Sequence, residues 1–161
     1  MLRYLLTMTI LCMTLLSCEK EKTLQEEFEE AAESEKWHFI PVPGMICRDN
    51  SNTGIGVRLK NSSNKVIIYL EGGGGCFHAV TCVANPGSYG QIAFDSWKTV
   101  GLQLGIFDNG SPHNPFKDWN FVYIPYCTGD VHGGTSYNTY VNLVYQDQKM
   151  AGHDNITLAL D

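Results

Sequence analysis

The chain has 161 residues, of which 43% are hydrophobic, and its formal net charge at pH 7 is −6. This length is enough for one domain with a core of its own. Residues 19–36 hold eight Glu and three Lys, so the rest of the chain is almost neutral, and no basic patch indicates a nucleic-acid partner.

The N-terminus has the pattern of an export signal. Arg3 precedes an apolar run over residues 4–16 that is too short to span a bilayer comfortably. The run leads into Ser17 and Cys18, and a small residue followed by Cys is typical of a bacterial lipoprotein cleavage site. We therefore predict a signal over residues 1–18 with lipidation at Cys18. The mature protein would be exported and held in the bacterial cell envelope, at the outer membrane or cell surface, only by its lipid. An ordinary signal peptide cleaved nearby is the alternative.

The acidic segment, residues 19–36, follows the signal. Within it, Leu24, Phe28 and Ala31 fall at helical spacing, which predicts a short helix. We expect this segment to be a solvated tether between the lipid and a domain formed by residues 37–161. A helix that binds a partner is the alternative.

Four cysteines remain beyond the signal, and in an exported protein we expect them to form disulfides. They are Cys47, Cys76, Cys82 and Cys127. Four cysteines allow three pairings. A local Cys76–Cys82 bridge would contribute about 2 kcal/mol in the chain-entropy model, and Cys47–Cys127, over about eighty residues, about 4 kcal/mol. The rival interpretation is a metal site that adds His78, but the spacing lacks a CxxC pair.

The domain begins with residues of extended character. Pro41 and Pro43 exclude a helix near residues 37–43. Residues 56–60 alternate between apolar and polar side chains, which predicts a strand with one face in solvent. The polar residues 61–64 predict a hairpin-like turn into the next strand.

The stretch that follows is the centre of the pattern. Val66 to Leu70 is an unbroken apolar run, β-branched at three of five positions, which predicts a strand buried on both faces as in a parallel sheet. After Glu71 the chain passes into four glycines, residues 72–75, which allow another group to approach the backbone closely. A buried strand that ends in a glycine turn is where α/β folds place ligand chemistry, although a merely flexible loop has the same composition.

Two further elements complete the predicted sheet. Residues 91–104 carry apolar side chains three or four apart, which predicts a helix over one face of the sheet. Residues 119–126 form a second apolar strand, and the loop over residues 127–134 is polar and rich in glycine. Because cysteines accompany both strand ends, we expect the two loops to lie at one rim of the sheet.

Three stretches carry a family pattern. They are Tyr69–Phe77 with Cys82 six residues after Cys76, Gly105–Phe107 leading to Asn114 and Pro115, and Phe121–His132. Together they resemble the pectin acetylesterase/Notum family of carbohydrate and lipid ester hydrolases, over about residues 37–161. The resemblance implies an α/β fold, here the N-terminal part of the doubly wound sheet of an α/β-hydrolase.

The resemblance also implies a chemistry, because family members cleave acyl esters with a Ser-Asp-His triad. Gly73 and Gly74 match the positions whose backbone N–H groups face the oxyanion. The family's cysteine pattern supports the pairings Cys76–Cys82 and Cys47–Cys127. The function implied is a carboxylic (acetyl) ester hydrolase for acetylated polysaccharide such as pectin, or for another acyl ester such as a lipid-modified peptide, without a metal or organic cofactor.

The chain departs from this family at the nucleophile. In the family, the serine lies in a Gly-x-Ser-x-Gly elbow after the helix that is predicted here to begin near Gly152, capped by Asp154 or Asn155. Ser88 and Ser136 each lack one of the two glycines. We therefore expect a fragment that is truncated before its nucleophile and inactive by itself.

Asp130 and His132 are candidate substitutes, because they would share a face in an extended segment, but no motif places a serine with them. Hydrogen bonding within the loop, or support of the oxyanion loop, is the simpler role for both. Whether the chain is an enzyme stays open. The alternative is a non-catalytic surface lipoprotein that binds a glycan or a partner.

Overall fold

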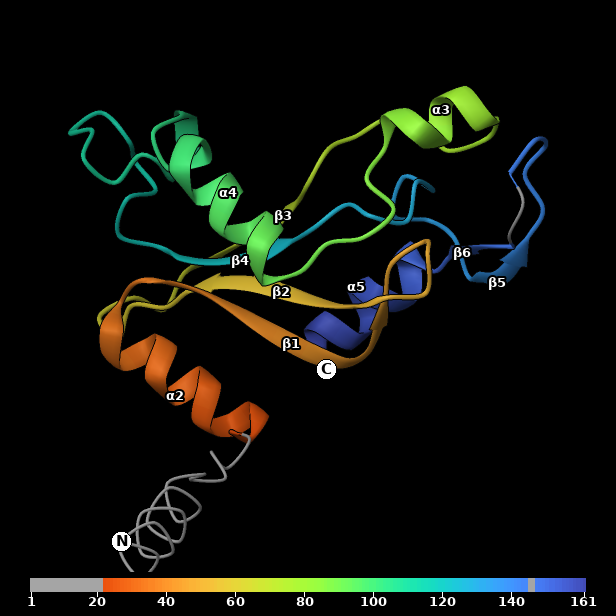
Figure 1. Ribbon diagram of the computed structural model, residues 1–161. Helices are drawn as coiled ribbons and strands as arrows, with labels where there is room; N and C mark the ends of the chain where they lie inside the picture. The colour runs from red at the N-terminus through yellow and green to blue at the C-terminus, as the bar shows by residue number, and fades with distance from the viewer. Residues whose placement is uncertain (1–21, 145–146) are drawn as a thin grey trace, which may run out of the picture.

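The computed structural model describes residues 22–144 and 147–161 (Figure 1). The predicted signal with Cys18, and the first residues of the acidic segment, lie outside the described residues. Within these two ranges, none of the helices is both long enough and apolar enough to cross a membrane.

A mixed sheet of four strands forms the centre of the fold, in the order β1-β2-β4-β3. The strands are β1 (Trp37–Ile46), β2 (Asn52–Arg58), β3 (Val66–Leu70) and β4 (Asn120–Ile124). β3 and β4 run parallel, whereas β1 with β2 and β2 with β4 are antiparallel. The two predicted apolar strands are thus confirmed as neighbours. The hairpin expected at residues 61–64 is wrong, because β4 lies between β2 and β3.

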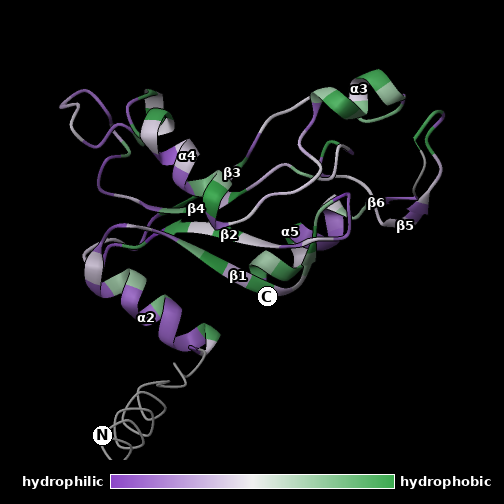
Figure 2. Ribbon diagram, in the orientation of Figure 1, coloured by the Kyte–Doolittle hydropathy of each residue, from purple (hydrophilic) through white to green (hydrophobic). Residues whose placement is uncertain are grey.

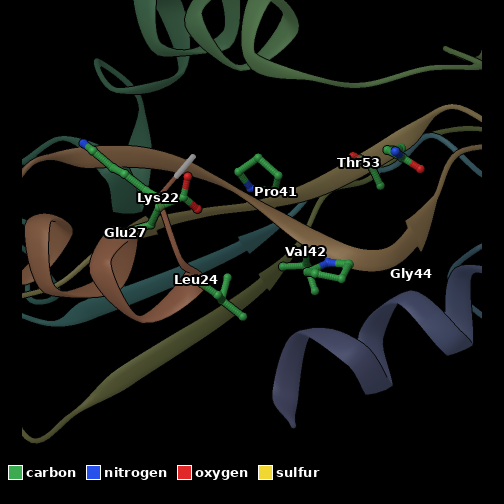
Figure 3. Close-up of a pocket in the computed structure, with 9 residues that line it drawn as sticks. Lys22, Leu24, Glu27, Pro41, Val42, Gly44 and Thr53 are labelled. Carbon is green, nitrogen blue, oxygen red and sulfur yellow. The ribbon is translucent and has the colours of Figure 1, made fainter. Parts of the chain in front are cut away.

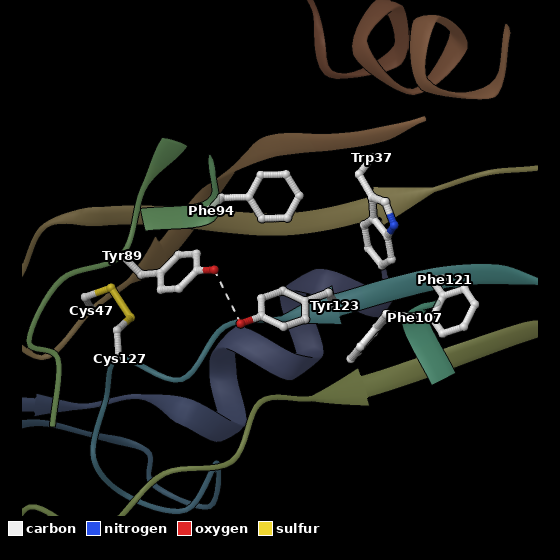
Figure 4. Close-up of a cluster of buried hydrophobic side chains, with 8 residues drawn as sticks. All are labelled: Trp37, Cys47, Tyr89, Phe94, Phe107, Phe121, Tyr123 and Cys127. Carbon is white, nitrogen blue, oxygen red and sulfur yellow. Dashed lines mark hydrogen bonds between the residues drawn. A yellow bond between two sulfur atoms is a disulfide. The ribbon is translucent and has the colours of Figure 1, made fainter. Parts of the chain in front are cut away.

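Helix α4 (Gln91–Gly101) covers one face of the sheet, as its apolar spacing predicted, and ends before Leu104. Aromatic rings fill the space between the helix and the sheet. Phe94 of the helix lies over the sheet beside Trp37 of β1 and Tyr123 of β4 (Figure 4). The 3-10 helix η1 (Gly105–Phe107) adds a further ring to this aromatic cluster.

Helix α2 (Leu24–Ser34) lies on the opposite face of the sheet (Figure 1). It begins with a capping box between Thr23 and Glu26, and its outer side is hydrophilic (Figure 2). Its Ala31 is fully buried in a cluster with Ile40 of β1. The helix expected in the acidic segment is therefore present, but its inner side is part of the core rather than a solvated tether.

Helix α5 (Gly152–Leu160) packs on the same face as α2 and confirms the helix expected from Gly152, but not its cap. Ala151 is the N-cap residue. Asn155 is buried instead, and its side-chain amide accepts the Ile46 N–H at 3.0 Å and donates to the Ile46 carbonyl at 2.8 Å. Because a buried amide needs partners for both its ends, these bonds fix α5 to the end of β1.

Strand β3 lies at the edge of the sheet, and only one of its faces is covered by described residues. Ile67 and Tyr69 pack against the aromatic cluster. The side chains of Val66, Ile68 and Leu70, on the other face, are 50%, 46% and 42% exposed. The prediction of a strand buried on both faces is wrong here, because α2 and α5 pack mainly on β1.

Arg58 of β2 is buried, so the solvent face predicted for residues 56–60 is wrong at this position. Its guanidinium donates to the carbonyls of Lys117 and Trp119 at 3.1 and 3.0 Å and lies 4.6 Å from the ring centre of Phe121. The burial lowers the pKa of Arg58. An arginine on a sheet can thus belong to the core when carbonyls and a ring receive it.

A smaller layer lies beyond the ends of β3 and β4. It contains helix α3 (Ala79–Ala84) and a two-stranded sheet of β5 (Ser136–Thr139) and β6 (Gln148–Met150). With helices on both faces of the main sheet, the α/β class predicted from the sequence is confirmed (Figure 1).

Candidate functional site

The glycine loop, residues 72–75, and the β4 loop, residues 127–134, lie side by side at one edge of the sheet. Because β3 and β4 are parallel neighbours, both strands end at this edge. The N–H of Cys76 donates to the carbonyl of Gly129 at 2.7 Å. The prediction that the two loops share one rim is confirmed.

Tyr126 is buried directly against the glycine loop. A Cβ atom on Gly73 would lie 2.1 Å from the Tyr126 ring, so a larger residue requires the ring to move. The Tyr126 hydroxyl donates to the carbonyl of Gly74 at 2.9 Å and accepts the N–H of Val131 at 2.8 Å. Burial raises the pKa of this hydroxyl above its ordinary value, which keeps it a donor at neutral pH.

The N–H groups of the glycine loop find no acceptor among the described residues. On either side of the loop, the N–H groups of Glu71 and Cys76 donate to backbone carbonyls. In the part of the chain that the structure describes, the four glycine N–H groups between them donate to no residue. Consecutive unbonded backbone donors at the end of a strand are what the stabilisation of an oxyanion requires.

Glu71 connects the end of β3 to the end of β4. Its N–H donates to the carbonyl of Ile124 at 3.0 Å, and its carboxylate accepts the N–H of Tyr126 at 2.8 Å. Its carbonyl lies 2.9 Å from Nε2 of His132. These contacts hold the first residue of the glycine turn against the neighbouring strand.

The aromatic cluster contains two buried tyrosines, Tyr89 and Tyr123, whose hydroxyls bond to each other. Tyr89 donates to Tyr123 at 3.3 Å (Figure 4). Burial, and then the nearby Glu71 carboxylate, raise the pKa of Tyr123. Burial also raises the pKa of Tyr89 to about 12. Both hydroxyls therefore stay protonated at neutral pH.

Both disulfides implied by the family resemblance are present, Cys47–Cys127 and Cys76–Cys82. The first joins the end of β1 to the β4 loop, and the second closes the segment after the glycine loop. His78 between the latter cysteines accepts the N–H of Val80 and so caps α3. Within residues 22–144 and 147–161, no group of three His, Cys, Asp or Glu side chains is placed to hold a metal ion.

Arg48 is a residue of this region that the sequence analysis missed. It is buried, and its guanidinium donates to the carbonyls of Cys82 and Asn85 at 2.8 and 2.9 Å and to the side chain of Gln148 at 2.8 Å. One side chain therefore connects the end of β1 with α3 and β6. A charged residue in a turn beside Cys47 has no periodicity that would mark it as buried.

Asp130 and His132 are close together but are not arranged as a catalytic pair. The Asp130 carboxylate accepts the hydroxyl of Thr128 at 2.6 Å and the backbone N–H groups of His132 and Gly152 at 3.1 and 2.7 Å. Both of its oxygens are thus used by structural donors, and one of these bonds satisfies the first N–H of α5. The imidazole of His132 faces the carbonyl of Glu71.

The serines of the two incomplete elbows are not hydrogen-bonded to this histidine in the described part of the chain. Ser88 and Ser136 are exposed, and within the described residues neither forms a hydrogen bond with His132 or Asp130. The rim thus contains unbonded backbone donors without a paired nucleophile among the described side chains.

A surface hollow lies between the start of α2 and the bulged part of β1 (Figure 3). It is lined by residues such as Leu24, Val42 and Thr53. None of its lining residues belongs to the glycine loop or the β4 loop, so it is not part of the candidate site.

The model of the pectinacetylesterase family matches residues 29–153, which include both strands and both loops of the rim. The chain belongs to the pectinacetylesterase family. The glycine turn, the short disulfide and the Tyr-Cys-Thr-Gly-Asp sequence after β4 all lie within the matched residues.

Three relatives agree with this family. Palmitoleoyl-protein carboxylesterase NOTUM of Schmidtea mediterranea is 38% identical over 92 residues, which cover 55% of this chain and 18% of that protein. Palmitoleoyl-protein carboxylesterase notum2 of Xenopus laevis is 29% identical over 119 residues, 71% of this chain and 24% of that protein. Inactive palmitoleoyl-protein carboxylesterase notum1b of Danio rerio is 30% identical over 106 residues, 65% of this chain and 76% of that protein.

The chain therefore spans about a fifth to a quarter of the length of the first two relatives. Among solved structures, the Wnt deacylase Notum from Drosophila matches with a TM-score of 0.52 and 21% identity, over 76% of this chain and 36% of that structure. This likeness shows that the two chains share an α/β fold over the matched residues.

Proposed function

We propose that residues 37–161 form the oxyanion-binding part of a carboxylic ester hydrolase, with the N–H groups of Gly73 and Gly74 as donors. The observation that carries this proposal is the row of unbonded N–H groups in the glycine loop, supported by Tyr126 at the shared rim of two parallel strands. Membership of the pectinacetylesterase family supports ester hydrolysis as the reaction class.

Ester hydrolysis places a negative charge on the carbonyl oxygen of the substrate, and the proposed donors stabilise that charge. When a serine attacks an ester carbonyl, the carbonyl oxygen becomes an anion, and two N–H donors placed against it lower the barrier by about 3 kcal/mol each. A histidine takes the serine proton and returns it to the leaving alcohol, and an aspartate orients the histidine. Because these 161 residues contain no Gly-x-Ser-x-Gly elbow, the proposal assigns the triad to a segment outside them. On this proposal the chain alone is inactive.

The proposed substrate is an acetylated polysaccharide such as pectin. The family name and the lipoprotein-type sequence before Cys18 support this choice, because a protein anchored to a bacterial surface meets glycans. The relatives are named for palmitoleoyl-protein esters, which makes a lipid-modified peptide the second choice of substrate.

A second candidate function is a non-catalytic surface lipoprotein that binds glycan or a partner. The specific observation in its favour is the Danio rerio relative, which is named inactive. The matched region covers 76% of that protein. Calorimetric titration with acetylated pectin, and with the same pectin after saponification, tests this candidate. Binding that depends on the acetyl groups would support recognition without hydrolysis.

The first experiment on catalysis uses the 161-residue chain itself. We expect hydrolysis of p-nitrophenyl acetate at the level of buffer. Turnover that His132→Ala abolishes would contradict the assignment of the triad to another segment.

The second experiment is to translate the DNA downstream of Asp161 in all frames. A Gly-x-Ser-x-Gly elbow within a few dozen codons would support the proposal, and an unrelated gene there would contradict it. If the elbow is found, a chain extended through the triad should hydrolyse the ester. In that chain, Gly73→Ala should lower kcat about a hundredfold, because the side chain displaces one donor. Gly72→Ala is the matched control, since a Cβ atom there meets nothing within 4 Å.

A further inference from the structure

Two consecutive residues of the β4 loop have backbone conformations that side chains rarely adopt. The φ angle is 53° at Val131 and 59° at His132. This left-handed region is unfavourable for any residue with a Cβ atom, and most of all for a β-branched residue such as valine. By contrast, none of residues 72–75 has a positive φ. The strain at the rim therefore lies in the β4 loop and not in the glycine loop, and strain of this kind persists only where other contacts hold it.

The contacts of this left-handed turn lead to the glycine loop. The N–H of Val131 donates to the Tyr126 hydroxyl, and that hydroxyl donates to the carbonyl of Gly74 at 2.9 Å. The Nε2 atom of His132 lies 2.9 Å from the carbonyl of Glu71. Because a carbonyl oxygen only accepts, this Nε2 carries the hydrogen. The turn thus directs two donors, an O–H and an N–H, at one carbonyl before the glycine loop and one within it.

These two bonds restrain the residues between them. Each bond holds a whole planar peptide group, the one from Glu71 to Gly72 and the one from Gly74 to Gly75. The three residues 72–74 that separate these peptides have two soft torsions each. That is as many torsions as define the position and orientation of one rigid peptide relative to another. When both peptides are held, the segment between them has no continuous freedom left. The N–H groups of Gly73 and Gly74 lie in this segment.

A run of glycines has the opposite tendency by itself, because glycine has more backbone freedom than any other residue. Donors that are already in place stabilise an oxyanion better than donors that must first be ordered. The glycine loop therefore gains from bonds that are made outside it. Tyr126 is suited to this role because it is buried, and His132 is half-buried beside it, with ring centres 4.9 Å apart.

We propose that Tyr126 and His132 are positioning residues for the N–H donors of Gly73 and Gly74, and that the left-handed turn at residues 131–132 keeps their two bonds in place. This inference rests on the proposed function, because it concerns the donors of the oxyanion site. Both residues act through the glycine loop and not on the substrate. The role of His132 is then donation to a backbone carbonyl, and not proton transfer.

Backbone amide NMR relaxation of the 161-residue chain tests the role of Tyr126. In the unmodified chain the N–H order parameters of Gly73 and Gly74 should be about 0.85, the value of rigid backbone. Tyr126→Phe keeps the buried ring and removes only the hydroxyl, and both order parameters should fall below about 0.6. Tyr140→Phe is the matched control, since Tyr140 is 76% exposed, and it should leave both values unchanged.

Substitutions of His132 separate positioning from acid–base chemistry. His132→Ala removes the donor and should lower the same two order parameters. His132→Gln should restore them, because the glutamine amide nitrogen can donate to the Glu71 carbonyl from a similar position, whereas glutamine cannot take up a proton as histidine does. His113→Ala, at an exposed position, is the control and should change neither value.

Val131→Gly tests the left-handed turn. Glycine adopts this conformation without strain, so the melting temperature should rise. The turn should also become looser, so the order parameters of Gly73 and Gly74 should fall. A turn that only stabilises the fold would not give a higher melting temperature together with a less ordered glycine loop.

Kinetics complete the test in a chain extended through the triad. There, Tyr126→Phe should lower kcat about tenfold and leave KM unchanged, because the donors act in the transition state. An inactive unmodified extended chain would contradict the proposed function, and the order parameters would still test the positioning.

Three results would overturn the inference. The first is a glycine loop that is already disordered in the unmodified chain or stays rigid in both Tyr126→Phe and His132→Ala. The second is a His132→Gln variant that is as disordered as His132→Ala. The third is an unchanged kcat in the extended Tyr126→Phe chain. Amide spectra of each variant show whether it is folded, and His132→Ala decides the first result if Tyr126→Phe does not fold.

Discussion

The two faces of the main sheet are covered to different degrees by other elements, and the five residues of strand β3 show the difference. Ile67 and Tyr69 face α4 and are packed among aromatic rings. The ring centres of Tyr69 and Phe107 are 4.9 Å apart. Val66, Ile68 and Leu70 face the side of α2 and α5 and remain about half exposed. The residue types are similar on both sides, so the covering element and not the strand decides burial.

This difference implies that most of the stability of the fold comes from the aromatic face. Its rings are large, and each buried aromatic side chain removes much apolar surface from water. The following predictions test the contrast, beginning with the largest effect.

Phe94→Ala should lower the free energy of unfolding by about 3–5 kcal/mol, because Phe94 is fully buried and its removal leaves a cavity between α4 and the sheet. Urea unfolding measures this value. Val66→Ala, on the open face, should cost less than about 1 kcal/mol, since half of that side chain is already in solvent. Equal losses in the two variants would show that the faces contribute alike.

The two disulfides extend the comparison from faces to regions. Cys47–Cys127 belongs to the aromatic cluster and closes 80 residues, whereas Cys76–Cys82 lies at the rim and closes six. Replacing both cysteines of the long bridge by Ala should cost about 4 kcal/mol, and the same change in the short bridge about 2 kcal/mol. Denaturant unfolding of the two double variants measures the difference. A larger loss from the short bridge would place the centre of stability at the rim.

Local patterns in the sequence were sufficient for much of this structure. The β-branched run at residues 66–70 and the spacing within residues 91–104 identified a strand and a helix, and the two loops were expected at one rim. The predictions that were wrong concern contacts between residues that are far apart in the sequence. No local signal shows that β4 inserts between β2 and β3, or that Arg58 meets the carbonyls of residues 117 and 119.

The candidate site divides in the same way. The glycines were visible because glycine runs are rare next to an apolar strand. Arg48 and Tyr126 were not, because their roles arise from contacts with Cys82, Asn85 and Gly74 that only the folded chain creates. Asn155 likewise resembled a helix cap in sequence, but its amide bonds Ile46 instead.

Within the rim, Gly73 and Gly72 differ in what surrounds them. Gly73→Ala should destabilise the fold by about 1–3 kcal/mol, because the new Cβ atom would overlap the Tyr126 ring. Gly72→Ala should change stability by less than about 0.5 kcal/mol, since the space there is open. Thermal unfolding of the two variants compares them. A tolerated Gly73→Ala would mean that the Tyr126 ring moves easily and does not position the loop.

The smallest expected effect is a dependence of the free energy of unfolding on pH in the alkaline range. Burial raises the pKa of Tyr89 to about 12, above the ordinary value of about 10. The folded state therefore keeps its full stability from this group below pH 10 and loses it as the pH rises toward 12. Urea unfolding at a series of pH values should show this decline, with a shallower slope in Tyr89→Phe. An unchanged slope in that variant would assign the decline to other groups.

The position of β4 between β2 and β3 has a consequence for the time course of folding. β1 and β2 are close in sequence and can pair as soon as both have emerged, but β3 precedes its neighbour by about fifty residues. At a synthesis rate of about 5–20 residues per second, β4 is synthesised several seconds after β3. During that interval the most apolar strand of the chain has two open edges, and it is the segment whose premature association a chaperone would have to prevent.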